Sequence, residues 1–173
     1  AFMVLASLSS LIWKHALADI AAKSAAPVGA VFTLICLITG SLWGKPIWNT
    51  WWEWDARLTS VLVLFFIYLG YMAIWSALET PQKAGRAAAI LCLVGAVNIP
   101  IIKWSVDWWS TLHQQASITL TKISLPADYI VPLFTMLAAY GVLFGALVIM
   151  NMRAEIFSRR AEMLVQRQYA SMD

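Results

Sequence analysis

Long apolar stretches without charged side chains dominate the chain and predict its membrane-spanning helices. Residues 24–44, 58–78 and 129–152 contain no Asp, Glu, Lys or Arg, giving runs of 21, 21 and 24 residues. A helix needs about 20 apolar residues to cross the hydrocarbon core of a bilayer. The strict alternation of apolar and polar residues that marks a membrane β-barrel strand is absent from the sequence. The pattern predicts an all-α, polytopic transmembrane helix bundle.

Two shorter apolar runs add to this prediction. Residues 87–102 can also span, provided that Lys103 reaches the interface. Asn98 and Pro100 inside this run predict a kink and its hydrogen-bond repair. Residues 1–13 are uncharged but start without Met or a basic segment, so we interpret them as the second half of a helix.

Composition excludes a water-soluble globular fold. The chain has 12 Lys and Arg and 9 Asp and Glu in 173 residues, and 61% of its residues are hydrophobic. A soluble domain carries about a quarter charged residues. Cys36 and Cys92 lie in apolar runs without the partners of a disulfide framework or zinc site. No P-loop motif is present, so we expect no nucleotide hydrolysis by this chain.

The basic residues predict the orientation of a single membrane domain, 1–173. One side holds eight of them: Lys14, Lys23, Lys83, Arg86, Arg153, Arg159, Arg160 and Arg167. The other side holds four: Lys45, Arg57, Lys103 and Lys122. Since cytoplasmic loops are enriched in Lys and Arg, residues 43–57 and 104–129 are expected to face outward. The tail, 152–173, is expected to be a cytoplasmic, basic amphipathic helix on the membrane surface.

Five of the ten tryptophans fall in the first outer segment, between Trp43 and Trp54. If a helix continues after Pro46, four residues at i, i+3, i+4 and i+7 line one face: Trp48, Trp51, Trp52 and Asp55. One interpretation is an interfacial aromatic belt. The other is a flat apolar platform for a large planar ligand.

The second outer segment contributes His113. It would share a helix face with Trp109 if the helix persists. It is either a solvated, hydrogen-bonded residue or, beside a tryptophan platform, an axial ligand of haem iron. His15 is expected at the opposite membrane face, outside the site.

The charged residues near the tryptophan segment could bind either the carboxylates of a ligand or a divalent metal ion. Arg57 is either an interfacial anchor or a partner for ligand carboxylates, with Lys45 and Lys103 as weaker candidates. Glu53 and Asp55 could hold a divalent metal. That arrangement defines the alternative hypothesis, an intramembrane transferase acting on a lipid-linked substrate.

The segment WGKPIWNTWWEWDARLTS, residues 43–60, closely resembles the WWD segment of haem-handling membrane proteins. Within that superfamily, the chain resembles the CcmC family of cytochrome c maturation. The supporting stretches are PVGAVF (27–32), AGRAA (84–88), VNIPII (97–102) and DWWSTLHQ (107–114). The resemblance extends through about His113.

The resemblance implies a six-helix protein of the bacterial inner membrane that is not an enzyme and binds haem b at its periplasmic face. Haem would pass to a membrane-anchored haem chaperone. The implied partners are an ABC-type ATPase, a second membrane subunit and a small single-helix subunit.

The resemblance also assigns residues of this chain. His113 matches the second of two axial histidines, and Arg57 matches a basic residue associated with haem handling. The first axial histidine has a His-Val-Pro context that this sequence lacks, so the first helix and part of the second are expected before Ala1. The implied platform consists of Trp43, Gly44, Trp48, Trp51, Trp52, Trp54 and Asp55.

Overall fold

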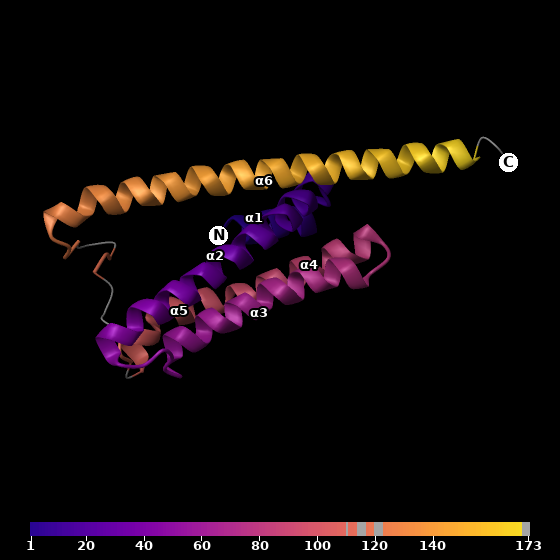
Figure 1. Ribbon diagram of the computed structural model, residues 1–173. Helices are drawn as coiled ribbons and strands as arrows, with labels where there is room; N and C mark the ends of the chain where they lie inside the picture. Colours follow the sequence, from indigo (N-terminus) through magenta and orange to yellow (C-terminus); the bar gives the residue numbers. More distant parts are fainter. Residues whose placement is uncertain (110, 114–116, 120–122, 171–173) are drawn as a thin grey trace.

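The computed structural model describes residues 1–109, 111–113, 117–119 and 123–170, and these residues form an all-helical fold (Figure 1). The helices are α1 (Phe2–Trp13), α2 (Ala16–Trp48), α3 (Ala56–Ala77), α4 (Pro81–Ala96), α5 (Asn98–Trp108) and α6 (Ala127–Ala170). Within the described part of the chain, β structure is limited to one isolated bridge, Ile118 with Ile123. The predicted fold class is confirmed.

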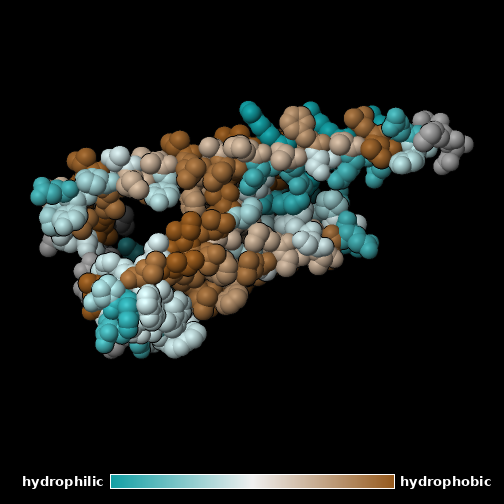
Figure 2. Space-filling model, in the orientation of Figure 1, coloured by the Kyte–Doolittle hydropathy of each residue, from teal (hydrophilic) through white to brown (hydrophobic). Residues whose placement is uncertain are grey.

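Among the described residues, four helical segments are long and apolar enough to cross a membrane. They are α2, α3, the α4–α5 pair (Pro81–Trp108) and α6, whereas α1 is a shorter apolar helix. Hydrophobic residues form a broad zone across the middle of the bundle, with hydrophilic residues gathered toward its ends (Figure 2). This distribution suits a protein with its centre in lipid and its ends in water.

The two ends of the bundle collect different helix termini (Figure 1). One end holds the turn from α1 to α2, the α3–α4 connection and the C-terminal part of α6. The other end holds the α2–α3 loop and the end of α5. The grouping of basic residues agrees with this arrangement, although Lys122 lies outside the described residues. Which end faces the cytoplasm stays a prediction.

The junction between α4 and α5 is the predicted break near Asn98. Helix α4 ends at Ala96 and α5 begins at Asn98, just before Pro100, which has no N–H to donate. The side-chain amide of Asn98 donates to the backbone carbonyl of Ser60 on α3, with a donor–acceptor distance of 2.7 Å. The polar side chain therefore joins the broken helix to a neighbouring one.

Small residues let the helices approach closely. Ala22, Ala26 and Ala88 lie buried at the centre of one hydrophobic cluster. A Cβ atom added to Gly95 of α4 would lie 2.6 Å from Cγ2 of Ile67 on α3. Because the hydrophobic effect does not drive helices together inside lipid, close van der Waals packing is a main source of their association.

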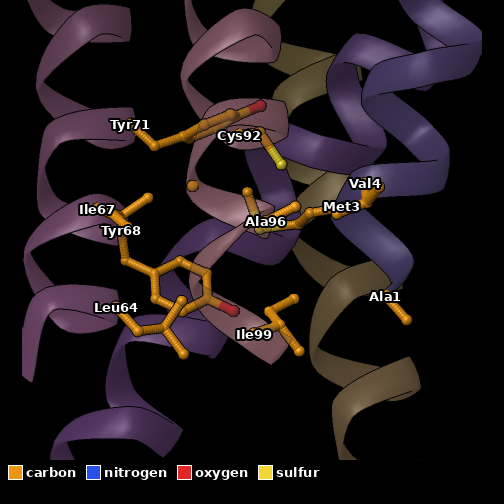
Figure 3. A pocket seen from close by; sticks show the side chains of 11 residues that line it. Ala1, Met3, Val4, Leu64, Ile67, Tyr68, Tyr71, Cys92, Ala96 and Ile99 are labelled. Carbon is orange, nitrogen blue, oxygen red and sulfur yellow. The ribbon is translucent and has the colours of Figure 1, made fainter. Parts of the chain in front are cut away.

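A narrow cavity lies between α1, α3, α4 and α5. Its volume is about 50 Å³, and Tyr68 and Tyr71 of α3 border it on one side, with Met3 and Val4 of α1 opposite (Figure 3). Cys92 of α4 also lines it and is buried as a free thiol. Small-molecule sites usually measure about 300–1,000 Å³, so this cavity cannot hold a haem.

An ionic cluster joins α6 to α2 and α3 at the end opposite the tryptophan-rich loop, which is the connection between α2 and α3. Lys23 lies 2.7 Å from the carboxylate of Glu155, and Arg159 lies 2.8 Å from the same oxygen. The Lys23 ammonium also lies 5.1 Å from the ring centroid of Trp75. The predicted tail is helical up to Ala170 and continues α6 without a break, and its residues 171–173 lie outside the described part of the chain.

Substitution of Gly95 by Ala should lower the free energy of unfolding by roughly 1–3 kcal/mol, because the new methyl group overpacks against Ile67. The matched control is Gly145→Ala in α6, where nothing lies within 4 Å of the added Cβ. We expect that control to be neutral or slightly stabilising. Equal effects of the two substitutions on unfolding in mixed micelles would contradict the close α3–α4 packing.

Candidate functional site

The tryptophan-rich segment is half helix and half loop. Helix α2 continues through Pro46 to Trp48, and Asn49 then adopts a left-handed conformation with φ 57°. Asn tolerates this conformation better than most residues, so the chain turns there. The prediction that Trp48, Trp51, Trp52 and Asp55 line one helix face is therefore wrong.

Asp55 occupies the junction between this loop and α3. Its side chain is 4% exposed, and Oδ1 accepts a 2.7 Å hydrogen bond from the backbone N–H of Leu58. That contact is the N-cap of α3, which satisfies one of the unpaired N–H groups of the first turn. The other oxygen, Oδ2, remains available and meets the second outer segment.

His113 lies against Asp55 although 58 residues separate them. Its Nδ1 is 2.7 Å from Asp55 Oδ2, and its backbone N–H donates to the hydroxyl of Thr111 over 2.8 Å. The indole of Trp48 meets the imidazole edge to face, with ring centroids 4.7 Å apart. The site thus joins the end of α2, the start of α3 and the segment after α5.

The predicted pairing of Trp109 with His113 on one helix face is wrong, because α5 ends at Trp108 and Trp109 has an extended backbone. His113 is placed by its hydrogen bonds and by Trp48 instead. Ser110 and Gln114 of the matching motif lie outside the described residues.

The contact with Asp55 indicates which ring nitrogen of His113 can bind a ligand. An ionised carboxylate can only accept hydrogen bonds, so Nδ1 carries the hydrogen that Asp55 receives. In a neutral imidazole this leaves the lone pair on Nε2. Histidines that ligate metals usually donate their other N–H to a carboxylate or carbonyl in this way. The side chain of His113 is 19% exposed, so part of the imidazole is accessible from the surface.

Most indoles of the platform are accessible at this end of the bundle. Trp43, Trp51 and Trp54 are 58%, 56% and 73% exposed. Trp52 is more buried and meets Trp54 edge to face, with centroids 5.5 Å apart. Gly44 is buried, and a Cβ there would lie 3.3 Å from the ring of Trp48.

The space enclosed beneath the loop is only about 10 Å³. A planar ligand would therefore have to lie on the outer surface of the indoles, not in a pocket. The platform offers apolar ring faces and edges next to His113, which suits a large aromatic macrocycle.

The cations near the platform differ in how they are engaged. Lys45 donates to the backbone carbonyl of Asn49 over 3.2 Å and lies 5.9 Å from the ring centroid of Trp51. Arg57, in the first turn of α3, is partly buried, and its guanidinium has no hydrogen-bond or ion-pair partner among the described residues. Lys103 is exposed on α5. Arg57 suits a carboxylate best of the three by chemistry, because a guanidinium can donate two parallel hydrogen bonds to it.

The alternative divalent-metal site is not favoured by this arrangement. Both oxygens of Asp55 are already engaged by hydrogen-bond donors, whereas Glu53 is exposed. Over the residues that the structure describes, no group of three or more His, Cys, Asp or Glu side chains gathers to hold a metal ion. The transferase hypothesis therefore gains no support from the geometry.

His15 lies outside the site, as its position in the sequence indicates. It directly precedes the first residue of α2, whereas Trp48 is the last residue of the same helix. A helix of 33 residues separates them by about 50 Å.

The sequence did not reveal one feature of the candidate site, the contact between Asp55 and His113. Asp55 was expected as part of the platform and His113 as an iron ligand, but not in contact with each other. No local signal links residues that lie in different loops, so only the tertiary fold could reveal the pair.

Comparisons with known proteins address the family directly. The model of the family described as CcmC, Heme exporter protein C, matches residues 1–167. A relative named Heme exporter protein C from Bradyrhizobium diazoefficiens is 56% identical over 98% of this chain and 65% of its own length.

Two further relatives carry the same name. The protein from Rhodobacter capsulatus is 48% identical over 96% of this chain and 69% of its own length. The protein from Escherichia coli K12 is 48% identical over 88% of this chain and 62% of its own length. The chain thus spans about two thirds of the length of these curated relatives. The match over nearly the whole chain shows that it belongs to the CcmC, or heme exporter protein C, family.

Proposed function

We propose that this chain binds haem b at the outer membrane face and hands it to a membrane-anchored haem chaperone during cytochrome c maturation. The relatives' shared name, Heme exporter protein C, supports haem as the cargo. The geometry around His113 supports the manner of binding. Because haem in this role is cargo to be passed on, the protein acts as a carrier and not as an enzyme.

The observation that carries the proposal is the 2.7 Å contact between Asp55 Oδ2 and His113 Nδ1. It holds the imidazole in the tautomer that exposes the Nε2 lone pair, and it raises the basicity of that nitrogen toward iron. Trp48 restricts the ring's rotation from the side. The other axial ligand would be the family's histidine in the His-Val-Pro context, which the sequence given does not contain.

The remaining platform residues would bind the porphyrin. The exposed rings of Trp43, Trp51 and Trp54 offer apolar area for the macrocycle, and Arg57, whose guanidinium is unpaired among the described side chains, suits a propionate. A haem on an open surface can be approached by a second protein. Two axial histidines would also leave the iron no open position for oxygen chemistry, which suits a carrier.

The proposed setting is a multi-subunit transporter of the bacterial inner membrane, with the tryptophan-rich loop in the periplasm. The excess of basic residues at the opposite end supports this orientation. The proposed partners are an ABC-type ATPase, a second membrane subunit and a small single-helix subunit. Nucleotide hydrolysis would belong to a partner, since the sequence given has no P-loop.

Substitution of His113 by Ala in the full-length gene product should remove one axial ligand. The Soret band of the detergent-purified protein should be lost or shifted, and the sharp α and β bands of the dithionite-reduced form should disappear. His15→Ala is the matched control, because His15 lies at the other end of α2, and its spectrum should stay unchanged. An unaltered spectrum in the His113 variant would remove this residue from the ligand role.

Substitution of Asp55 by Asn should weaken haem binding without unfolding α3. Asn caps helices about as well as Asp, but it removes the charge that supports His113. We expect haem to be lost to excess apomyoglobin 10–100-fold faster, roughly the effect of losing an outer-shell partner of a metal ligand. The reduction potential of the bound haem should rise as well.

The control for this substitution is Glu53→Gln, which removes the same charge from an exposed side chain two residues away. It should leave both the rate of haem loss and the potential unchanged. If the two variants behave alike, Asp55 contributes only general charge, and its positioning role is wrong.

The tryptophan platform can be separated from an aromatic belt by comparing two exposed indoles. Trp54 is 73% exposed beside the site, and Trp13 is 71% exposed at the other end of the bundle. Trp54→Ala should reduce haem occupancy several-fold, since a stacked ring is lost. Trp13→Ala should not change haem occupancy. If the tryptophans only anchor the protein in the membrane interface, Trp54→Ala and Trp13→Ala should change haem occupancy equally.

A further inference from the structure

The C-terminal half of α6 presents an ordered surface that the bundle does not use. Met150, Phe157 and Leu164 follow one another at intervals of seven residues and are 65%, 64% and 64% exposed. Positions seven apart drift by only about 20° around a helix, so these side chains form one apolar line. We call this apolar line, together with Arg153, Arg160 and Arg167 beside it, the tail stripe.

The tail stripe points away from the rest of the chain. The side of α6 that meets the bundle is marked by Asn151, which donates to the Ser24 carbonyl over 3.1 Å, and by Glu155, which pairs with Lys23. Each residue advances about 100° around a helix. Phe157 and Leu164, two and nine positions after Glu155, therefore lie close to the opposite side.

Three arginines flank the apolar line at the same interval. Arg153, Arg160 and Arg167 are all exposed. Each lies three residues after one member of the apolar line, in the order Met150, Phe157 and Leu164. None of the three guanidiniums has a carboxylate partner among the described residues. Helices that pair at heptad spacing use apolar a and d positions for contact and charged e and g positions for partner choice, and the tail stripe supplies one apolar and one charged position of that repeat.

The helix is long enough to carry this surface out of the membrane. Residues 153–170 continue α6 for about 27 Å beyond its charge-free run. Sharp helix kinks occur almost only at Pro, Gly–Ser pairs, π-bulges or inserted groups. The sequence from 146 to 170 contains neither Pro nor Gly, and Figure 1 shows a straight α6 that extends past the α3–α4 end of the bundle. This geometry favours a projecting rod over a helix lying flat on lipid.

A second copy of this chain is a poor partner for the stripe. On the other side of the apolar line from the arginines lie Ser158 and Val165. If two copies of α6 paired in parallel, the arginines of one copy would therefore meet no carboxylates of the other. An antiparallel pair would place arginines beside arginines. The acidic residues of this part of α6, Glu155 and Glu162, lie toward the bundle, where they line a cavity with Trp75.

We propose that the tail stripe docks an α-helix of a different protein, with apolar residues at heptad spacing and a flank of Asp or Glu. Phe157 and Leu164 would supply the buried contact, and the three arginines would supply orientation and selectivity. The docking site lies at the end of the molecule opposite the haem platform. It does not depend on the proposed haem function.

The test uses the full-length protein in its native membrane. A photo-crosslinking amino acid replaces Leu164 on the stripe or, as the matched control, Met163, which is 54% exposed but about 100° away around the helix. The crosslinked segment is identified by mass spectrometry. We expect Leu164 to crosslink to an acidic amphipathic helix of another chain, with at least fivefold less product from Met163.

Charge reversal supplies the second arm. In the background of Arg153→Glu, Arg160→Glu and Arg167→Glu, the Leu164 crosslink should fall at least tenfold, while the haem spectrum stays unchanged. If the reversed protein does not insert, because cytoplasmic cations help to set topology, the three Arg→Gln changes replace it and should give the same loss. Crosslinks to lipid, to a second copy or to a segment without acidic residues would overturn the proposal. So would an absent product, or a product insensitive to the arginines.

Discussion

The carboxylate of Asp55 links the fold of this protein to its candidate chemistry. One oxygen caps α3 and the other receives the Nδ1 hydrogen of His113, so a single buried group sets both where a membrane helix begins and where an imidazole points. Burial strengthens both contacts, because few water molecules compete for the carboxylate. Trp48 and His113 add an aromatic contact between two of the three chain segments that meet here. Truncation of this side chain would therefore loosen the helix start and the imidazole together, whereas Asn would keep the cap alone.

The bilayer explains why the site is an open platform. Inside lipid, backbone groups must be paired within helices, so irregular segments that can carry a varied set of side chains occur at the ends of the bundle. The internal cavity of about 50 Å³ and the space of about 10 Å³ beneath the loop both exclude a macrocycle. The exposed indoles at this end offer an open surface instead. An open site is also what a carrier needs if a second protein must collect the ligand.

The two ends of the molecule then have different physical characters. The tryptophan-rich end combines large apolar rings with one directed nitrogen, which suits a planar metal complex. The other end combines an ionic cluster, which fixes α6 to α2 and α3, with a projecting helix that repeats apolar and basic positions. The first arrangement suits a small ligand and the second suits a protein. A subunit that passes cargo while attached to partners would need both.

The sequence by itself determined the helical fold, the spans, the break at Asn98 and the family, because charge-free length and the local WWD motif are properties of neighbouring residues. It also identified His113 and the tryptophans as the residues of interest. It left open whether the helices continue past Trp48 and Trp108, because a left-handed Asn49 and an extended Trp109 cost little and can be decided by the loops around them. Only the tertiary structure decided that Asp55 meets His113, since a contact across 58 residues depends on how helices pack and leaves no periodic trace in the chain.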